Sequence, residues 1–384
     1  MIKNNLIIGL QKDLLNWFDD YGRHWIPWKL NSDGLPPENG EIISPYGIWI
    51  AEIMLQQTQL NVVLPYWEKW MKTFPLLNNL VDSNEHNILM HWRGLGFYSR
   101  AMRIQKSSKL LIEHIGKDNT LDPLSWPTDL NSWIVLPGVG KSTAGSIISS
   151  AFDKPFPILD GNVKRILSRL IASEKTLDKD QNRLWKLSKQ LLPLYRARDF
   201  NQALMDLGAT VCTLKKPKCL YCPLQQYCLA YINYDPIDFP KKKMKKIIPI
   251  EKIGIALVFN SNGDLIIDQR LESSSMGGMW EFPGGKKESN ESIEDTIKRE
   301  VREELGIEVQ VGNQLLSFDH SYSHRKLQFE VYLCKLKSGN PKPLASQKIL
   351  WVAPIRLLDF PFPSANSKII SALLEYLGIE CERL

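Results

Sequence analysis

The chain lacks a long apolar stretch, and its first residues, MIKNNLIIGLQKDLLNWF, soon carry Lys12 and Asp13. A membrane span needs about 20 consecutive apolar residues, and a secretory signal needs an uninterrupted apolar centre. Cysteine is also scarce, and Cys334 and Cys381 stand far apart, which excludes a disulfide-stapled secreted scaffold. These absences predict an amphipathic N-terminal helix in a reduced, cytoplasmic protein that does not bind a membrane.

The other four cysteines form one compact group with the spacing C-x6-C-x2-C-x5-C. They are Cys212, Cys219, Cys222 and Cys228. A zinc ribbon would have two separated C-x2-C pairs or a mixture of cysteine and histidine, and no histidine lies nearby. Four soft thiolates in one loop are the ligand set of an iron–sulfur cluster. Structural zinc and free buried thiols remain the alternatives.

The length of 384 residues predicts two domains. Residues 1–232 show apolar positions at helical spacing, and they hold all of the net charge of +6, as expected of a part that binds a polyanion. Residues 233–250 are a basic, proline-containing linker with the run Lys241–Lys246. From residue 251 onward, strand-like segments and two helices, one of them Ile293–Leu305, predict an α+β domain.

Two strand-like segments, IGIALVF and LIIDQR, flank a predicted turn at Ser261–Asp264, and LQFEVYLCKL and ILWVAP follow later. The fold class that we predict is therefore multidomain. It has an all-α N-terminal part with the cysteine loop at 212–228, followed by the α+β part.

Two carboxylates and a glycine-rich turn accompany the cysteines. The turn is LPGVGKSTAG, Leu136 to Gly145, and Asp160 follows it in PILDGNVKR. Glycines at a helix N-terminus let backbone N–H groups point at a phosphate. Glu52, in AEIMLQQTQ, is the second carboxylate. An acid and a carboxylate are what cleavage of a glycosidic bond requires.

Together these motifs resemble the endonuclease III/MutY superfamily, with its helix–hairpin–helix–GPD signature and [4Fe–4S] loop, and most closely the MutY-type adenine DNA glycosylases. The resemblance implies that Glu52 protonates the adenine N7 and that Asp160 stabilises the sugar cation. Because the base must leave the stack, it also implies a set of residues that contact DNA or the base. These are Trp28, Gln57, Thr58, Phe97, Tyr98, Gly138, Gly140, Ser142 and Gln202.

Bifunctional relatives carry a Schiff-base lysine two residues after the second hairpin glycine. Here that position is Ser142, and Lys141 comes one residue too early. One residue turns a helical side chain by about 100°, so Lys141 should face the DNA backbone or solvent. We therefore predict a monofunctional glycosylase. An endonuclease III-like glycosylase with lyase activity is the alternative.

Residues Gly285 to Ile307 match every position of the Nudix consensus. Glu300, Glu303 and Glu304 fall on one helical face and could hold Mg²⁺ against a diphosphate. Arg270 and Asn366 resemble nucleotide-binding positions of MutT, so 8-oxo-dGTP is a candidate substrate. Leu350, however, stands where MutT has a further metal-site glutamate.

MutY-type enzymes carry a Phe-Ser-His motif that reads 8-oxoguanine. Here Tyr322, Ser323 and His324 occupy that place. The expected partner is double-stranded DNA with adenine opposite 8-oxoguanine or guanine, bound by a monomer. Two further alternatives are a protein that is mainly a Nudix pyrophosphohydrolase and a redox-sensing DNA-binding protein. The motifs assign no role to the insertion near residues 30–44.

Overall fold

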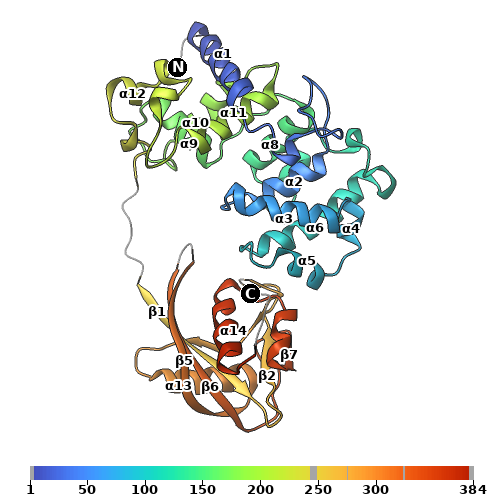
Figure 1. Cartoon of the computed structure of the whole chain (residues 1–384), viewed down its shortest axis with the longest axis vertical. Coiled ribbons are helices and arrows are strands. Elements are labelled where there is room, and N and C mark those ends of the chain that lie inside the picture. The colour runs from blue at the N-terminus through green and yellow to red at the C-terminus, as the bar shows by residue number, and fades with distance from the viewer. Residues whose placement is uncertain (1–3, 243–248, 275, 323–324, 380–384) are drawn as a thin grey trace. The chain divides into compact units, whose positions relative to one another are not determined.

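The computed structural model describes residues 4–242, 249–274, 276–322 and 325–379. Contacts divide the chain into two compact units. One comprises residues 1–82 and 103–245, and the other comprises residues 83–102 and 246–384. The first unit is helical and the second contains a β-sheet (Figure 1), which confirms the predicted fold class. Among the described residues, no helix combines the length and the apolar character needed to cross a bilayer.

Loops of varied length, some with 3-10 turns, join the helices of the N-terminal part. Its α-helices are α1 (Asn4–Tyr21), α2 (Pro45–Met54), α3 (Leu60–Thr73), α4 (Leu77–Val81), α5 (Glu85–Trp92), α6 (Ser99–Ile115), α7 (Leu130–Ile134), α8 (Lys141–Phe152), α9 (Gly161–Leu170), α10 (Gln181–Leu191), α11 (Ala197–Thr210) and α12 (Leu229–Asn233). Helix α5 and the start of α6 lie in the segment 83–102 that clusters with the second unit.

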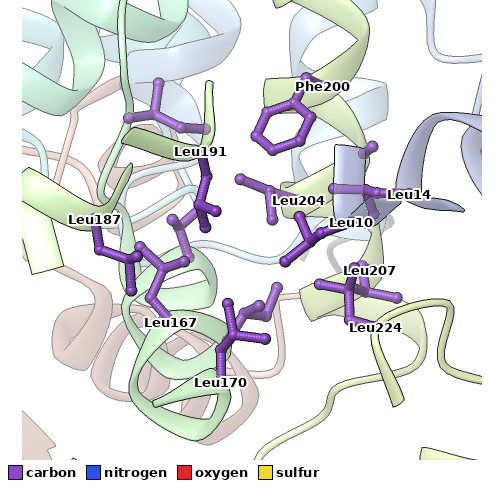
Figure 2. Packing of buried hydrophobic residues seen from close by; sticks show 14 of the residues in the cluster. Leu10, Leu14, Leu167, Leu170, Leu187, Leu191, Phe200, Leu204, Leu207 and Leu224 are labelled. Atoms are coloured by element: carbon purple, nitrogen blue, oxygen red, sulfur yellow. The ribbon is translucent and has the colours of Figure 1, made fainter. Parts of the chain in front are cut away.

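The N-terminal helix α1 is anchored in the core of the first unit. Its leucines pack with apolar side chains of α9, α10 and α11, and Leu224 from the cysteine loop joins the same cluster (Figure 2). Burying one such side chain stabilises the fold by roughly 1.5–3 kcal/mol. The labelled members are Leu10, Leu14, Leu167, Leu170, Leu187, Leu191, Phe200, Leu204, Leu207 and Leu224. This core therefore packs the N-terminal helix α1 and the cysteine loop against the same helices.

Helix α2 is buried almost throughout and contacts α8. Pro45 begins it, where a missing N–H costs nothing. Nine of its ten residues are fully buried, and Glu52 is partly buried. A single acidic side chain on an otherwise apolar, enclosed helix is held in a fixed position, which is what a catalytic acid requires.

The start of the predicted linker differs from the expectation of an exposed segment. Phe239 is only 2% exposed, and the Arg169 guanidinium donates hydrogen bonds to the Pro236 and Phe239 carbonyls at 2.8 and 3.0 Å. The aromatic ring in the sequence NYDPIDFP is therefore packed on the helical unit. The second half of the linker, residues 243–248, lies outside the described residues.

The second unit contains a seven-stranded sheet in which the strand order is β3-β2-β1-β6-β5, with β4 paired to β1 and β7 paired to β2. The β1 and β6 strands run parallel, and the other pairs are antiparallel. The strands are β1 (Ile250–Phe259), β2 (Leu265–Gln269), β3 (Trp280–Glu281), β4 (Gly284–Lys286), β5 (Glu308–Tyr322), β6 (Arg325–Ser338) and β7 (Lys348–Val352).

One helix covers each face of this sheet. Alternate residues of β1 enter different clusters: Ile255 and Leu257 pack with α14 (Ser364–Tyr376), whereas Ala256 and Val258 pack with α13 (Ile293–Leu305). This alternation follows from the two-residue period of a strand. The predicted helix Ile293–Leu305 and four of the strands are confirmed. β3, β4 and β5 were missed, since the first two are very short and β5 contains irregular register.

Candidate active site

Glu52 lies where α2 meets α8. The Ser146 hydroxyl of α8 donates a hydrogen bond to Glu52 Oε1 at 2.8 Å. Burial raises the pKa of Glu52 to about 7, the Ser146 hydrogen bond opposes this shift, and the charge of Asp160 adds to it. A carboxyl group with this pKa is protonated in a substantial fraction of molecules near neutral pH, as a general acid must be.

Asp160 occupies the N-cap of α9, and its Oδ1 accepts a hydrogen bond from the Val163 amide at 2.7 Å. Burial raises the pKa of Asp160, while the amides of Val163 and Asn162 and the cation Arg165 oppose the shift. The carboxylate is therefore held at the positive end of a helix. Glu52 and Asp160 interact electrostatically, so the structure brings the two predicted catalytic residues together.

The hairpin between α7 and α8 shows why its glycines occur where they do. Gly138 has a φ of +85°, and a Cβ there would lie 3.1 Å from Arg103. Gln56 Nε2 donates to the Gly138 carbonyl at 3.0 Å. Gly140 is the N-cap of α8, with nothing close to the place of its missing Cβ. The turn therefore presents open backbone at a helix N-terminus.

Ser142 does not have a free hydroxyl facing outward. Its Oγ accepts a hydrogen bond from the Leu159 amide at 2.9 Å, so it fixes the chain next to Asp160, and its role as a DNA contact stays a prediction. Lys141 is exposed, and its Nζ lies 4.4 Å from the centre of the Trp185 ring. Lys141 thus faces solvent, as predicted.

Trp28 and Gln202 lie near a buried ion pair, Lys29 with Asp206, that the sequence did not reveal. The Trp28 ring packs against Trp67, with 5.4 Å between ring centres. The next residue, Lys29, is buried, and its Nζ donates to Asp206 Oδ2 at 3.0 Å. Gln202, one turn before Asp206, is 5% exposed. Gln202 and Lys29 both line a cavity of about 510 Å³.

The insertion near residues 30–44 forms another wall of this cavity, through residues 36–39. Arg198 of α11 anchors the insertion because its guanidinium donates to the carbonyls of Glu38 and Glu41 as well as to Ser150. Asp153 adds to this anchoring by accepting from the Gly40 amide at 3.1 Å. The insertion is thus bound to the helical core by polar contacts.

Two adjacent aromatic residues that are predicted to contact DNA, Phe97 and Tyr98, differ from each other in exposure. Phe97 has a φ of 48° and is 45% exposed, which leaves its ring available to DNA. Tyr98 is only 4% exposed, and its hydroxyl accepts from the Gly94 amide at 3.1 Å. Tyr98 is thus buried in the loop, and its predicted contact with DNA stays a prediction. Gln57, with a φ of 59°, is exposed, and Thr58 is partly buried.

All four cysteines of the 212–228 loop line one small cavity, together with Arg169. The Arg169 Nη1 lies 3.2 Å from Cys212 Sγ, and the guanidinium also donates to the Thr213 and Leu214 carbonyls. No disulfide joins these thiols. Burial raises the pKa of Cys222 to about 12 and raises the pKa of Cys219 and Cys228. Thiolates in this cavity would need a compensating metal.

The Nudix-box helix α13 is capped by Ser292 and ends at Gly306, which has a φ of +68°. Arg299 pairs with Glu300 at 2.8 Å and with Glu303 at 3.3 Å. Glu304 turns toward the sheet, where its Oε2 accepts from the Gly284 amide at 2.9 Å. Within the part of the chain that is described, no group of three or more His, Cys, Asp or Glu side chains is placed to hold a metal ion.

The predicted nucleotide and 8-oxoguanine positions also lie in this unit. Arg270 forms an ion pair with Glu281, and Asn366 is 6% exposed in the first turn of α14. Tyr322 ends β5 at a hairpin tip. Ser323 and His324 lie outside the described residues.

Three residues that sequence reasoning missed take part in these sites: Ser146, Arg169 and Asp206. Ser146 sits one turn after Ser142 on α8, so the helical period could have placed it beside a catalytic group. No sequence signal marks the other two, because their partners are far away along the chain.

Comparison with known proteins agrees with this geometry. The family of HhH-GPD superfamily base excision DNA repair proteins matches residues 50–190, and the NUDIX domain family matches residues 254–372. An adenine DNA glycosylase of Buchnera aphidicola subsp. Schizaphis graminum is 34% identical over 359 residues, covering 93% of this chain and 96% of that protein. The Mus musculus adenine DNA glycosylase is 31% identical over 415 residues, covering 94% and 77%.

Among solved structures, a thermostable thymine-DNA glycosylase matches with a TM-score of 0.50 and 24% identity, over 60% of this chain and 98% of that one. This likeness supports the helical fold. The sequence relatives extend across both the helical and the Nudix regions. The chain therefore belongs to the family of adenine DNA glycosylases, and it is an enzyme of the class that hydrolyses N-glycosyl bonds.

Proposed function

We propose that the chain removes adenine from double-stranded DNA where it is mispaired with 8-oxoguanine or guanine, and that it leaves an abasic site. The observation that supports this most is the pairing of Glu52, with a pKa of about 7, and the N-cap carboxylate Asp160. Two carboxylates in different environments are suited to acid and stabilising roles in glycosidic cleavage.

In the proposed reaction, protonated Glu52 donates its proton to the adenine N7, which makes the base a better leaving group. The positive charge that develops on the sugar lies near Asp160, and attack of water then completes hydrolysis. Ser146 holds the Glu52 carboxyl group in one orientation. Ser142 stands at the position of the Schiff-base lysine and has no amine, so the reaction proceeds without a covalent Schiff base to DNA.

Flipping of adenine requires the duplex to be opened at the mismatch. The exposed Phe97 ring, held in a left-handed conformation, is suited to insert between bases. Gln57 is likewise exposed on a left-handed turn that follows α2. We assign the reading of 8-oxoguanine to the motif Tyr322, Ser323 and His324, with Ser323 and His324 as the contacts.

The test is Glu52→Gln in the full-length chain. This variant should lose adenine release while it still binds an A·8-oxoguanine duplex in a gel-shift assay. Substantial residual turnover would remove Glu52 as the acid. Borohydride treatment of wild-type reactions should trap no abundant covalent adduct, and an abundant one would favour the lyase alternative instead.

We also propose that Cys212, Cys219, Cys222 and Cys228 hold a [4Fe–4S] cluster. The fit rests on their common cavity, on the absence of disulfides among them, and on the Arg169 guanidinium, which lies beside Cys212 Sγ. When bound, the cluster would supply cross-linking of the loop and a redox-active centre. The buried Arg169 of α9 holds the cysteine loop against this helix through its hydrogen bonds to the loop.

A second candidate activity, hydrolysis of 8-oxo-dGTP with Mg²⁺, is favoured by the complete Nudix box on α13. Against it stand Leu350 and the engagement of Glu300 and Glu303 by Arg299. Monophosphate release from 8-oxo-dGTP or dGTP should be followed beside a Glu303→Gln/Glu304→Gln double variant. Turnover that the variant loses supports the activity. No turnover would mean that the domain acts only in reading the opposite base.

A further inference from the structure

A polar cavity of about 510 Å³ lies between α1, α11 and the insertion near residues 30–44. Its volume falls in the range of small-molecule binding sites. Gln202 lines it from α11, and Glu38 and Asn39 line it from the insertion. No motif gives the insertion a role, and neither Glu38 nor Asn39 has a part in the reaction described above.

The side-chain amide of Gln202 is buried and lacks a protein partner. The residue is only 5% exposed, and within the described part of the chain no group forms a hydrogen bond with this amide. A buried amide without a partner lowers the stability of a fold, so native structures rarely keep one unless a ligand or water completes it. An amide offers one donor and one acceptor side by side, which matches an adenine edge where the amino group stands next to a ring nitrogen.

The described Lys and Arg side chains that line the cavity are all engaged within the protein. Arg196 pairs with two aspartates, and Lys29 pairs with Asp206 at 3.0 Å. Arg198 donates to backbone carbonyls. A phosphate or another anion in this cavity would therefore have to displace an existing ion pair or hydrogen bond.

Three other side chains that line the cavity keep uncommitted polar groups. Among the described residues, the Glu38 carboxylate and the Asn39 amide have no side-chain partner, as is the case for Gln202. A carboxylate accepts hydrogen bonds, whereas an amide both donates and accepts. A neutral heterocycle with an amino group complements this set. An oxo group in place of the amino group would face the carboxylate as a second acceptor.

The cavity and the proposed acid Glu52 are carried by helices that pack together. Asn201, the residue before Gln202, donates to Ser149 Oγ at 2.9 Å. Ser149 lies three residues after Ser146, which donates to Glu52. These contacts join α11 to α8, so a base held against Gln202 lies in the part of the chain that also positions the acid.

We propose that the insertion forms a wall of the pocket for the flipped adenine, where Glu38 and Asn39 join Gln202 in selecting a base with an exocyclic amino group. This inference rests on the proposed removal of adenine and adds specificity-determining residues to it. Glu38 accepts a hydrogen bond from the amino group, and a charged acceptor makes that bond stronger than a neutral one does. Arg198 holds the wall through the carbonyls of Glu38 and Glu41, which leaves the side chains free to contact the base.

The experiment compares single-turnover release of adenine and of hypoxanthine from duplexes that carry either base opposite 8-oxoguanine. Hypoxanthine has the purine frame of adenine with an oxo group in place of the amino group. Glu38→Gln should lower the preference for adenine by about tenfold, because the charged acceptor is replaced by an amide that also donates to an oxo group. Asn39→Ala should slow adenine release by about fivefold, the loss expected for one hydrogen bond.

Asp33→Asn is the matched control. Asp33 is an exposed residue of the insertion that does not line the cavity, so this variant loses the same negative charge away from the base. Its preference for adenine should equal that of the wild type. Limited proteolysis within residues 31–41 should also be unchanged in Glu38→Gln, because Arg198 binds the Glu38 carbonyl and not its side chain.

Three results would overturn the proposal while the removal of adenine stands. If Glu38→Gln keeps the wild-type preference and Asn39→Ala keeps the adenine rate, the base does not contact the insertion. If Asp33→Asn changes the preference as much as Glu38→Gln does, the charge of the insertion acts through DNA binding. A lost preference together with faster proteolysis would make Glu38 a structural residue. A wild type that releases no adenine would instead refute the proposed function, and this inference with it.

Discussion

Replacing Ser146 by alanine tests how the protein sets the acidity of Glu52. The Ser146 hydroxyl donates to Glu52 Oε1 at 2.8 Å, and this bond lowers a pKa that burial has raised to about 7. A hydrogen bond to a charged acceptor contributes roughly 1.5–3 kcal/mol, against about 1 kcal/mol for a neutral one. The difference of about 1.4 kcal/mol corresponds to about one pH unit.

Ser146→Ala should therefore raise the pKa of Glu52 from about 7 to about 8. The reaction needs the protonated acid, so the rate falls as pH rises through this pKa. At about pH 8.5, the protonated fraction, and with it the single-turnover rate of adenine release, should be about eightfold higher in the variant. At about pH 5.5, where Glu52 is protonated in both proteins, the rates should agree within about twofold.

The assay is single-turnover cleavage of an A·8-oxoguanine duplex across this pH range. Ser149→Ala is the control, because Ser149 is buried on the same helix but bonds to the Ser146 carbonyl and to Asn201 instead. Its pH profile should match that of the wild type. An alkaline limb that does not move in Ser146→Ala would refute the assignment of Glu52 as the acid whose proton this serine controls.

Three other perturbations test the fold around the site. Glu52→Gln should be more stable than the wild type by about 2–3 kcal/mol at pH 8. The reason is that a carboxyl whose folded pKa is raised destabilises the fold as pH rises from its unfolded pKa to about 7. Urea unfolding should show no such gain near pH 4, and equal stability at pH 8 would contradict the claim that burial raises the pKa of Glu52. Arg198→Ala should lower the free energy of unfolding by about 3 kcal/mol and speed proteolysis within residues 31–41, since several carbonyls lose their buried donor. Unchanged proteolysis would show that Arg198 does not hold the insertion in place. Arg169→Gln should reduce the iron content per chain at least by about half, because Arg169 joins the cysteine loop to α9. Lys141→Gln is the control and should keep its iron. Full iron content in Arg169→Gln would show that Arg169 does not support the cluster.

Much of this protein could be predicted from local sequence signals. The hairpin glycines, the spacing of the cysteines and the Nudix box each specify a local geometry within a few dozen residues. Glu52 and Asp160 were found because the segments around them are distinctive. The helix Ile293–Leu305 was placed correctly because Ser292 caps its start and Gly306 adopts the left-handed conformation at its end.

Errors occurred where exposure depends on packing. Phe97 and Tyr98 are adjacent aromatic residues, and only the folded loop shows that one ring is exposed and the other is buried. The sequence did not reveal that the Ser142 hydroxyl accepts from the Leu159 amide, seventeen residues away. The linker was expected to begin at residue 233, yet Arg169 holds the chain as far as Phe239.

The sequence by itself determined which chemical groups are present and which local turns hold them, because caps, glycine conformations and metal-ligand spacings depend on neighbours along the chain. Tertiary structure alone decided the acidity of Glu52. This acidity depends on burial and on groups brought from distant segments: Ser146, which donates to Glu52, is 94 residues away, and the charge of Asp160 comes from the N-cap of α9. Electrostatic energy depends on distance in space and on the exclusion of water, and a sequence records neither.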